Sequence, residues 1–307
     1  MRSIIAGLSL GVVLLAVGCN VLQPRSPVGP GPREATPKVE DLIGYLNTNA
    51  RRIQNVEAVS CTNVDIDVQA DGRAVSLAGK LMCQTPRNFR LTGVVLGNPA
   101  VDVGSNKDEF WYWISRDKPP YLYHCSYAAL ARGVNIPFPF QPDMAVSALG
   151  LAEYDPNKKY EMKIVDNKKG YKAIELIEQA VSPQNQPIQK VTVFDFHEAP
   201  PPQPQVIAHV LKDAQGNVLC VAEVRKVQQV GSRGAVLPKE VVFRWPSQKL
   251  QMTMKLHNPQ IVIMNEEKAA RVFSRRDLGY TSFDLATRTL DSGTLQRAGA
   301  TTPVGMR

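Results

Sequence analysis

The feature that most constrains the fold of this chain is the alternation of apolar and polar residues along most of its length. It is clearest in residues 60–81, where two alternating stretches flank Asp71-Gly72, a dipeptide that favours a two-residue hairpin turn. Such a turn pairs residue 70 with residue 73 and places the apolar side chains of both strands on one face. Three opposed pairs follow from this register: Val64 with Gly79, Ile66 with Leu77, and Val68 with Val75.

Further segments with strand character continue almost to the end of the chain. They are residues 88–96, 108–114, 121–125, 160–165, 171–178, 188–196, 205–212, 217–228, 239–245, 249–257 and 260–264. Two segments are predicted as helices: residues 38–55, capped by Thr36 with Pro37 at the first helical position, and a short one at 143–151. Together they predict a mainly β protein with some α (α+β), built as one strongly curved antiparallel sheet covered by helices rather than as two domains.

The N-terminus carries a targeting signal. A short basic start precedes an apolar run at residues 4–17, which is too short to span a bilayer comfortably and is typical of a secretory signal peptide. The run leads into the tetrapeptide AVGC, which resembles a bacterial lipobox, so we expect a signal peptide at 1–18 and a lipidated Cys19. Ordinary cleavage near Gly18 is the alternative. Asn20, in place of an aspartate, favours the outer membrane over the inner membrane.

The segments on either side of the alternating region differ from it in composition. Residues 20–37 contain five prolines, so we expect 19–37 to be a lipidated tether that extends over about 50 Å. Residues 286–307 are polar and aperiodic and are predicted to be a disordered tail. One folded domain over 38–285 is left between them.

The net charge of +8 narrows the class of partner. Loss of residues 1–18 removes only Arg2 among the charged residues and leaves +7. Because an envelope protein does not meet nucleic acid, we expect the positive charge to contact anionic lipid head groups or simply to solvate the surface. The chain is expected to be a monomer.

Catalytic and metal-binding patterns are weak. Residues 38–285 contain no Gly-x-Ser-x-Gly nucleophile motif, and the four histidines do not form a recognisable dyad; His209 and His257 are interpreted as strand-surface residues. Asp65 and Asp67 share one polar strand face, where solvation is the simplest interpretation. We therefore expect no enzymatic activity, no bound metal and no cofactor.

The cysteines that follow Cys19 lack the close spacing of zinc ligands. They are Cys61, Cys83, Cys125 and Cys220. A disulfide between Cys61 and Cys83 would need a bulge or a three-residue turn in the hairpin, because its register places them on opposite faces. Free buried thiols are therefore expected.

The strongest functional signal is apolar and is distributed over several elements. Residues 250–256 carry leucine and methionine on one face, and the run 110–113 puts large aromatics on both faces of its strand. Such residues form either a plain core under the long helix or the lining of a cavity for an acyl chain. The candidate lining residues are Leu42, Leu46, Val64, Ile66, Leu77, Phe89, Leu91, Trp111, Trp113, Met252, Met254 and Leu256.

The order of short motifs along residues 38–275 resembles the LolA/LolB-like family of outer-membrane lipoprotein-sorting proteins. After the helix and the DG hairpin come PRNFRL at 86–91, GSNKDEFW at 104–111, Val193-Phe194-Asp195, the turn at 213–216, Leu237-Pro238, Trp245-Pro246, Asn265 and Phe273. The resemblance implies a half-open antiparallel barrel with helices at its mouth. It also implies that the hollow binds acyl chains or the lipid moiety of lipoproteins. A lipidated member would be closer to the membrane-anchored receptor than to the soluble carrier.

The sequence thus predicts a lipid-anchored, periplasm-facing protein that binds a hydrophobic ligand and takes part in lipoprotein sorting or insertion at the outer membrane. A structural or interaction lipoprotein with a packed core is the alternative from another class. A cavity under the helices would favour the first, and a filled sheet interior would favour the second.

Overall fold

In the computed structural model, the structure describes residues 36–70, 72–134, 141–166, 172–196, 205–277 and 279–290. The expected signal peptide, Cys19 and most of the tether lie outside these residues, as do the turn residue Asp71 and the tail beyond 290. The described residues form one compact unit. No helix among them is long and apolar enough to cross a membrane.

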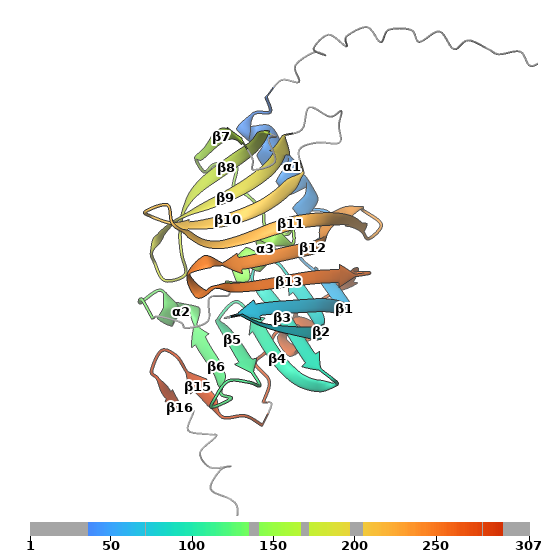
Figure 1. Cartoon of the computed structure of the whole chain (residues 1–307). Coiled ribbons are helices and arrows are strands. Elements are labelled where there is room, and N and C mark those ends of the chain that lie inside the picture. The colour runs from blue at the N-terminus through green and yellow to red at the C-terminus, as the bar shows by residue number, and fades with distance from the viewer. Residues whose placement is uncertain are drawn as a thin grey trace, which may run out of the picture. The chain divides into compact units, whose positions relative to one another are not determined.

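A single sheet dominates the described chain (Figure 1). Its strands are β1 (Glu57–Ala70), β2 (Arg73–Gln84), β3 (Asn88–Val95), β4 (Asn98–Ser105), β5 (Glu109–Ile114), β6 (Leu122–Ser126), β7 (Tyr160–Asp166), β8 (Lys172–Val181), β9 (Pro187–Phe196), β10 (Val206–Asp213), β11 (Val218–Val230), β12 (Ala235–Trp245), β13 (Leu250–His257), β14 (Gln260–Ile263), β15 (Ser282–Asp284) and β16 (Thr289–Leu290). Four α-helices accompany them: α1 (Val39–Ala50), α2 (Tyr127–Leu130), α3 (Pro142–Ala148) and α4 (Glu266–Val272).

The sheet consists of two meanders joined edge to edge. One runs from β1 to β6 and the other from β7 to β13, and β1 pairs with β13 to connect them. Neighbouring strands are antiparallel except for β15, which pairs with β6 in parallel. Within the described residues, β7 and β16 form the two ends of the order, so the sheet is unclosed. The single antiparallel sheet predicted from the alternation is therefore present.

The predicted hairpin register is confirmed from residue 64 onward. Val64 lies opposite Gly79, Ile66 opposite Leu77, and Val68 opposite Val75. A bulge between Cys61 and Val64 shifts the register, but it places Cys61 opposite Leu81 and Cys83 opposite Val59. Both cysteines are free and buried, as are Cys125 and Cys220.

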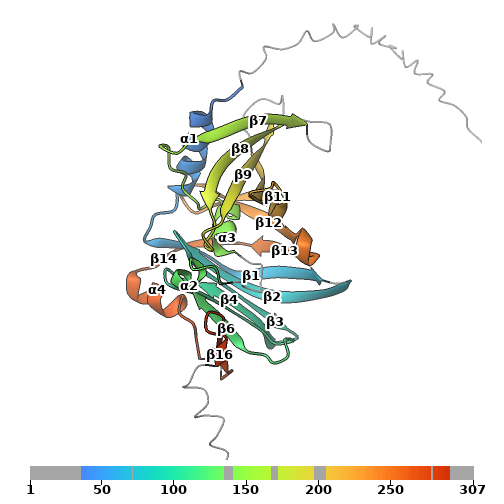
Figure 2. The ribbon, with the colours of Figure 1, turned by 90° about the vertical axis from the view of Figure 1, so that its left-hand side faces the viewer.

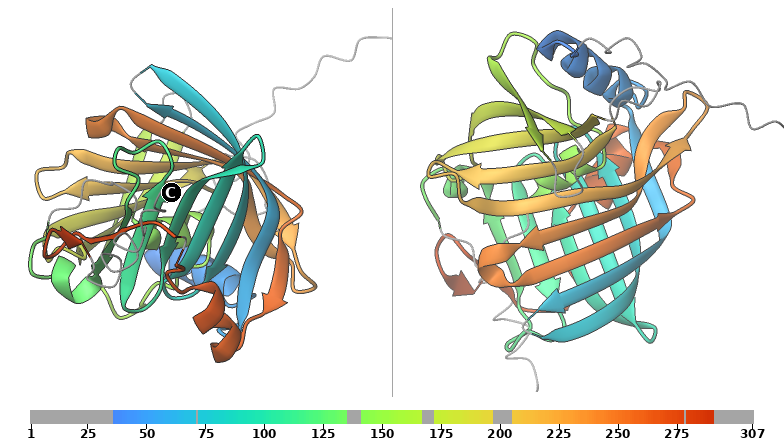
Figure 3. Two further views of the ribbon diagram at one scale, coloured as in Figure 1. Left: turned by 90° about the horizontal axis from the view of Figure 1, so that it is seen from below. Right: turned by 45° about the horizontal axis from the view of Figure 1, so that its top comes forward.

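The sheet curls around α3. This short helix contacts β3 of the first meander and both β10 and β11 of the second, although these strands are far apart in the sheet order. Figures 2 and 3 show the two meanders facing each other with α3 between them. One continuous apolar cluster fills most of this concave side, from Phe89 on β3 through Ala145 on α3 to Phe243 on β12.

The long helix differs from its prediction at both ends. It begins at Val39 rather than near Pro37, because Lys38 is the N-cap and its N–H donates to the Asp41 carboxylate at 3.0 Å. It ends at Ala50, and the chain reaches β1 through a short turn. The helix covers one end of the concave face, where Leu42, Ile43 and Leu46 pack with Ile174, Leu176 and Phe194 of β8 and β9.

The aromatic strand β5 separates two clusters. Phe110 and Tyr112 face the concave core, whereas Trp111 and Trp113 lie on the other face in a cluster with Leu122 and Tyr280. Tyr280 stacks on Trp113 at 4.4 Å between ring centroids. The C-terminal segment that covers this outer face is held by Arg90, which donates to the backbone oxygens of Val272 (2.9 Å) and Ser274 (3.1 Å).

Candidate functional site

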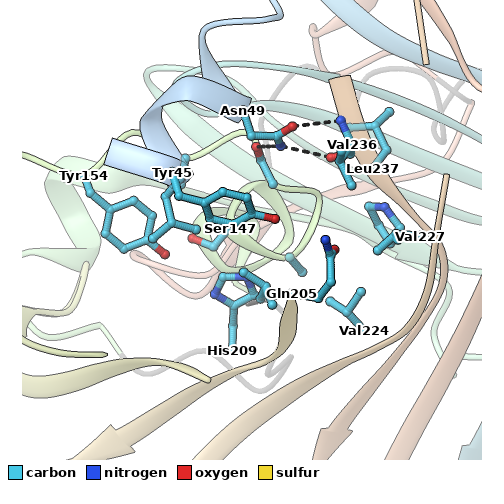
Figure 4. A pocket seen from close by; sticks show the side chains of 16 residues that line it. Tyr45, Asn49, Ser147, Tyr154, Gln205, His209, Val224, Val227, Val236 and Leu237 are labelled. Atoms are coloured by element: carbon cyan, nitrogen blue, oxygen red, sulfur yellow. Dashed lines mark hydrogen bonds between the residues drawn. The ribbon is translucent and has the colours of Figure 1, made fainter. Parts of the chain in front are cut away.

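Two cavities in the described part of the chain are lined in part by α3 and the residues that follow it. The smaller has a volume of about 50 Å³ and is enclosed by α1, the segment that follows α3, and strands β10 to β12 (Figure 4). Its lining is mostly apolar and includes Leu46, Val224, Val227 and Leu237. A cavity of this size holds a few water molecules but no acyl chain.

Three buried polar side chains form a chain of contacts at the smaller cavity. The Tyr154 hydroxyl lies 2.8 Å from Thr192 Oγ1, which lies 3.4 Å from His209 Nδ1. Burial lowers the pKa of His209 to about 4 and raises that of Tyr154 to about 12, so both are neutral near pH 7. The interpretation of His209 as a strand-surface residue was wrong, because its side chain faces the interior beneath α1.

Two asparagines of α1 fix the helix over this cavity. Asn47 Nδ2 donates to the Tyr154 carbonyl at 2.8 Å, and its Oδ1 accepts from the Tyr154 N–H at 2.7 Å. Asn49 makes the equivalent pair with the backbone of Val236 and also donates to the Gly150 carbonyl at 3.1 Å. The helix is thus tied both to β12 and to the segment after α3.

The larger cavity has a volume of about 810 Å³ and opens on the other side of this segment. Its lining comes from both meanders. Lys190 belongs to β9 of the second meander, whereas Arg87 and Lys107 belong to the β2–β3 and β4–β5 turns of the first. Its volume is in the range of small-molecule sites. Ser147 and Ala152 line both cavities, so the α3 end and the following residues form a shared wall.

The larger cavity has a mixed lining. Its apolar lining residues are Val146, Leu151, Ala152 and Pro86, of which Val146 and Leu151 are only 3% and 1% exposed, and charged side chains surround them. Arg87 makes a bidentate ion pair with Asp143 at the start of α3, with distances of 2.9 and 3.2 Å, and lies over the Tyr127 ring. This arrangement suits an amphiphile rather than a purely apolar ligand.

The predicted lining residues are placed mostly in the packed core. Leu42 lies on the buried face of α1, and the concave cluster contains Val64, Ile66, Leu77, Phe89, Leu91, Met254 and Leu256, with Met252 packed against it. Among the twelve, only Leu46 lines either cavity. Trp111 and Trp113 face away from both cavities, because the alternation along β5 turns them to the outer face. We therefore leave the two tryptophans out of the proposed ligand contacts.

Sequence reasoning missed the polar residues of the site. Arg87 and Lys107 stand in turns, where charge is ordinary, and nothing in the sequence links them to β9. Lys190 did carry a signal, because it interrupts a run of apolar and small residues at alternate positions between Ile188 and Phe194. Among the described residues, no group of three or more His, Cys, Asp or Glu side chains is placed to hold a metal ion.

Comparison with known proteins gives similarity at the level of the fold. No family model matches the chain, and no curated protein matches it. The chain is similar to a DUF1329 family protein from Desulfovibrio piger, with 7% identity, a TM-score of 0.49, and coverage of 77% of this chain and 98% of that one.

Two further solved structures are similar to the chain. One, from Vibrio parahaemolyticus, is provisionally described as an outer membrane lipoprotein-sorting protein domain (8% identity, TM-score 0.49, coverage 76% and 98%). The other is a LolA superfamily protein from Nitrosomonas europaea (10% identity, TM-score 0.43, coverage 76% and 97%). At these identities, the function has to be derived from this chain's own geometry.

Proposed function

We propose that this chain is a non-enzymatic, lipid-anchored protein of the bacterial cell envelope that binds the acyl chain of an amphiphile. The observation that carries the proposal is the cavity of about 810 Å³ beside α3, which shares Ser147 and Ala152 with the apolar cavity under α1. The acyl chain lies along Val146, Leu151 and Ala152. Its end points toward the cavity under α1.

Burial of apolar surface provides the affinity. Each methylene that leaves water for such a wall contributes about 0.8 kcal/mol. The smaller cavity is too small for a chain, so a long ligand has to displace the segment after α3. Gly150, with a φ of 74°, follows the end of α3 and begins that segment. Its carbonyl accepts a hydrogen bond from Asn49 Nδ2.

The anchoring part of the proposal rests on the N-terminal sequence. A lipidated Cys19 and the proline-rich tether place the binding domain near the membrane, and Asn20 favours the outer membrane. In that place the protein takes up lipid or the acyl chains of lipoproteins for sorting or insertion. Substitution of Cys19→Ala releases the protein from membranes if this anchor exists, whereas retention in the membrane fraction contradicts it.

Uptake of a fluorescent fatty acid by the purified protein tests ligand binding. The wild-type protein is expected to give a saturable fluorescence increase. Ala152→Trp fills the wall shared by the two cavities and is expected to abolish the increase. Ala78→Trp, at an exposed position of β2 away from both cavities, is the matched control and should bind like the wild type. Equal uptake by both variants would refute this site.

A second candidate function follows from the filled core. Most of the concave face is packed side chain against side chain, with Phe89, Leu91 and Met254 at most 3% exposed. A structural or interaction lipoprotein needs only such a packed core. It predicts no fluorescence increase with the wild-type protein at any fatty acid concentration.

A further inference from the structure

Lys190 occupies an unusual position in β9. Ile188, Thr192 and Phe194 stand at alternate positions of the same strand and are buried against the concave core or α1. Because strand residues two apart share a face, Lys190 belongs to this interior face. It is nevertheless exposed, because the cavity of about 810 Å³ opens at this point.

The charge of Lys190 is not balanced by its strand neighbours. Glu178 lies directly opposite on β8, but its carboxylate accepts a hydrogen bond from Lys158 Nζ at 2.6 Å. On the other side, Lys190 faces Leu211 of β10. Among the described residues, no carboxylate lies within ion-pair distance of the Lys190 ammonium.

The remaining charges of the cavity leave a positive excess. The Arg87 and Asp143 side chains neutralise each other in their bidentate pair. The other charged lining residues are two cations, Lys107 and Lys190, and one carboxylate, Glu153. Lys107 stands in the β4–β5 turn and, like Lys190, lacks an ion-pair partner among the described residues. Two flexible cations therefore line one half-enclosed cavity, where charge is screened less than on an open surface.

We propose that this cavity is selective for amphiphiles with an anionic head group, a carboxylate or a phosphate, which Lys190 and Lys107 bind. The inference rests on the proposed function and adds the ligand's charge to it. The ammonium groups donate charge-assisted hydrogen bonds to the head group, and the acyl chain runs from there along Leu151 and Ala152. The selectivity follows from the unpaired lysines, whereas the affinity for the tail does not depend on them.

Titration calorimetry with probes of equal chain length tests this proposal. The full-length protein is titrated below the micellar range with dodecanoate, dodecyl phosphate, dodecanol and dodecylammonium. Both anions are expected to bind at least about tenfold more tightly than the alcohol, and the cation more weakly than the alcohol. Added salt should lower the affinity for both anions and leave the affinity for the alcohol unchanged. Acetate should not compete; effective competition by acetate would make this a small-ion site and overturn the proposal.

Substitutions of the lysines distinguish binding of the head group from binding of the acyl tail. Lys190→Gln and Lys107→Gln are each expected to lower the affinity for dodecanoate about fivefold without changing the affinity for dodecanol. Lys190→Arg should restore most of the lost affinity. Lys80→Gln, at an exposed position of β2 outside both cavities, is the matched control. If dodecanoate and dodecanol bind equally and Lys190→Gln changes neither, the charge selectivity is wrong and acyl binding stands. If none of the probes binds, the proposed function fails as well.

Discussion

Asn49 and Val236 join α1 to β12 through two hydrogen bonds that imitate a strand pair: the Val236 N–H donates to Asn49 Oδ1 at 2.8 Å, and Asn49 Nδ2 donates to the Val236 carbonyl at 2.9 Å (Figure 4). A third bond, to the Gly150 carbonyl, extends the connection to the segment after α3. One amide side chain therefore holds together three parts of the wall around the smaller cavity.

Removal of this amide should loosen the site. Asn49→Ala is expected to lower the free energy of unfolding by about 2–3 kcal/mol, because it leaves backbone groups of Val236 and Gly150 without partners. Thr48→Ala, next to it on the exposed side of α1, removes one hydroxyl bond to the Gly44 carbonyl and should change little. Urea unfolding of both variants measures the difference. Equal stabilities would show that the Asn49 bonds do not hold the helix.

The two faces of β5 give a prediction about glycine. Gly104 lies opposite Trp111 in the β4–β5 pair, and a Cβ at Gly104 would overlap the indole ring. Gly104→Ala is therefore expected to destabilise the protein by about 1–3 kcal/mol. The same substitution at Gly44, where a Cβ meets nothing within 4 Å on helix α1, should stabilise it by about 0.5–1 kcal/mol. Thermal unfolding that shifts both variants in the same direction would contradict these placements.

The β3–β4 turn carries an unfavourable backbone conformation. Leu96 has a φ of 49° and is 96% exposed, and Gly97 follows with a φ of 82°. Leucine gains nothing from burial there, whereas asparagine tolerates this region of the Ramachandran map and favours such two-residue turns before glycine. Leu96→Asn is expected to raise the free energy of unfolding by about 1 kcal/mol. A loss of stability in urea unfolding would refute this account of the turn.

Burial of His209 predicts a dependence of stability on pH. Its pKa falls from 6.5 to about 4 in the folded protein, so between these values the unfolded chain binds a proton that the folded one does not. This contribution to stability is complete above pH 6.5. It is lost as the pH falls toward 4, at up to about 1.4 kcal/mol per pH unit.

Comparison of the wild type with His209→Asn isolates this contribution. Because the variant lacks the titrating group, its stability should fall less steeply between pH 6.5 and pH 4, and the difference in slope should approach one proton. Unfolding curves measured across this range provide the slopes. Identical slopes would mean that His209 is protonated in the folded protein, and hence not buried under α1.

Local patterns predicted the strands well where a turn and its flanking residues agree. The register around Ile66 and Leu77 followed from one dipeptide turn, and α3 followed from a short apolar segment that ends at Gly150. Strand β4 was missed because Pro99 and Gly104 weaken the strand pattern. Its glycine is explained only by Trp111 on the neighbouring strand.

The site could not be predicted to the same degree because it depends on contacts between distant strands. The pairing of β1 with β13 and the curl around α3 bring Lys190 to the cavity that the turn residues Arg87 and Lys107 line. Alternation selected buried side chains such as Phe89 and Met254, but it does not distinguish packed residues from those that line a void. The informative signal was the positive charge of Lys190 on an interior strand face. Its significance can be recognised only once the order of the strands is known.

Photo-crosslinking with a fatty acid that carries a diazirine at its terminal carbon tests the central claim most directly. The proposed binding mode predicts saturable, one-to-one labelling of peptides around the two cavities, chiefly residues 147–154 and the facing part of α1 near Tyr45. Unlabelled dodecanoate should prevent this labelling. Labelling that falls instead on exposed apolar side chains such as Val181 and Ile263, or none that saturates, would contradict an acyl-binding cavity beside α3.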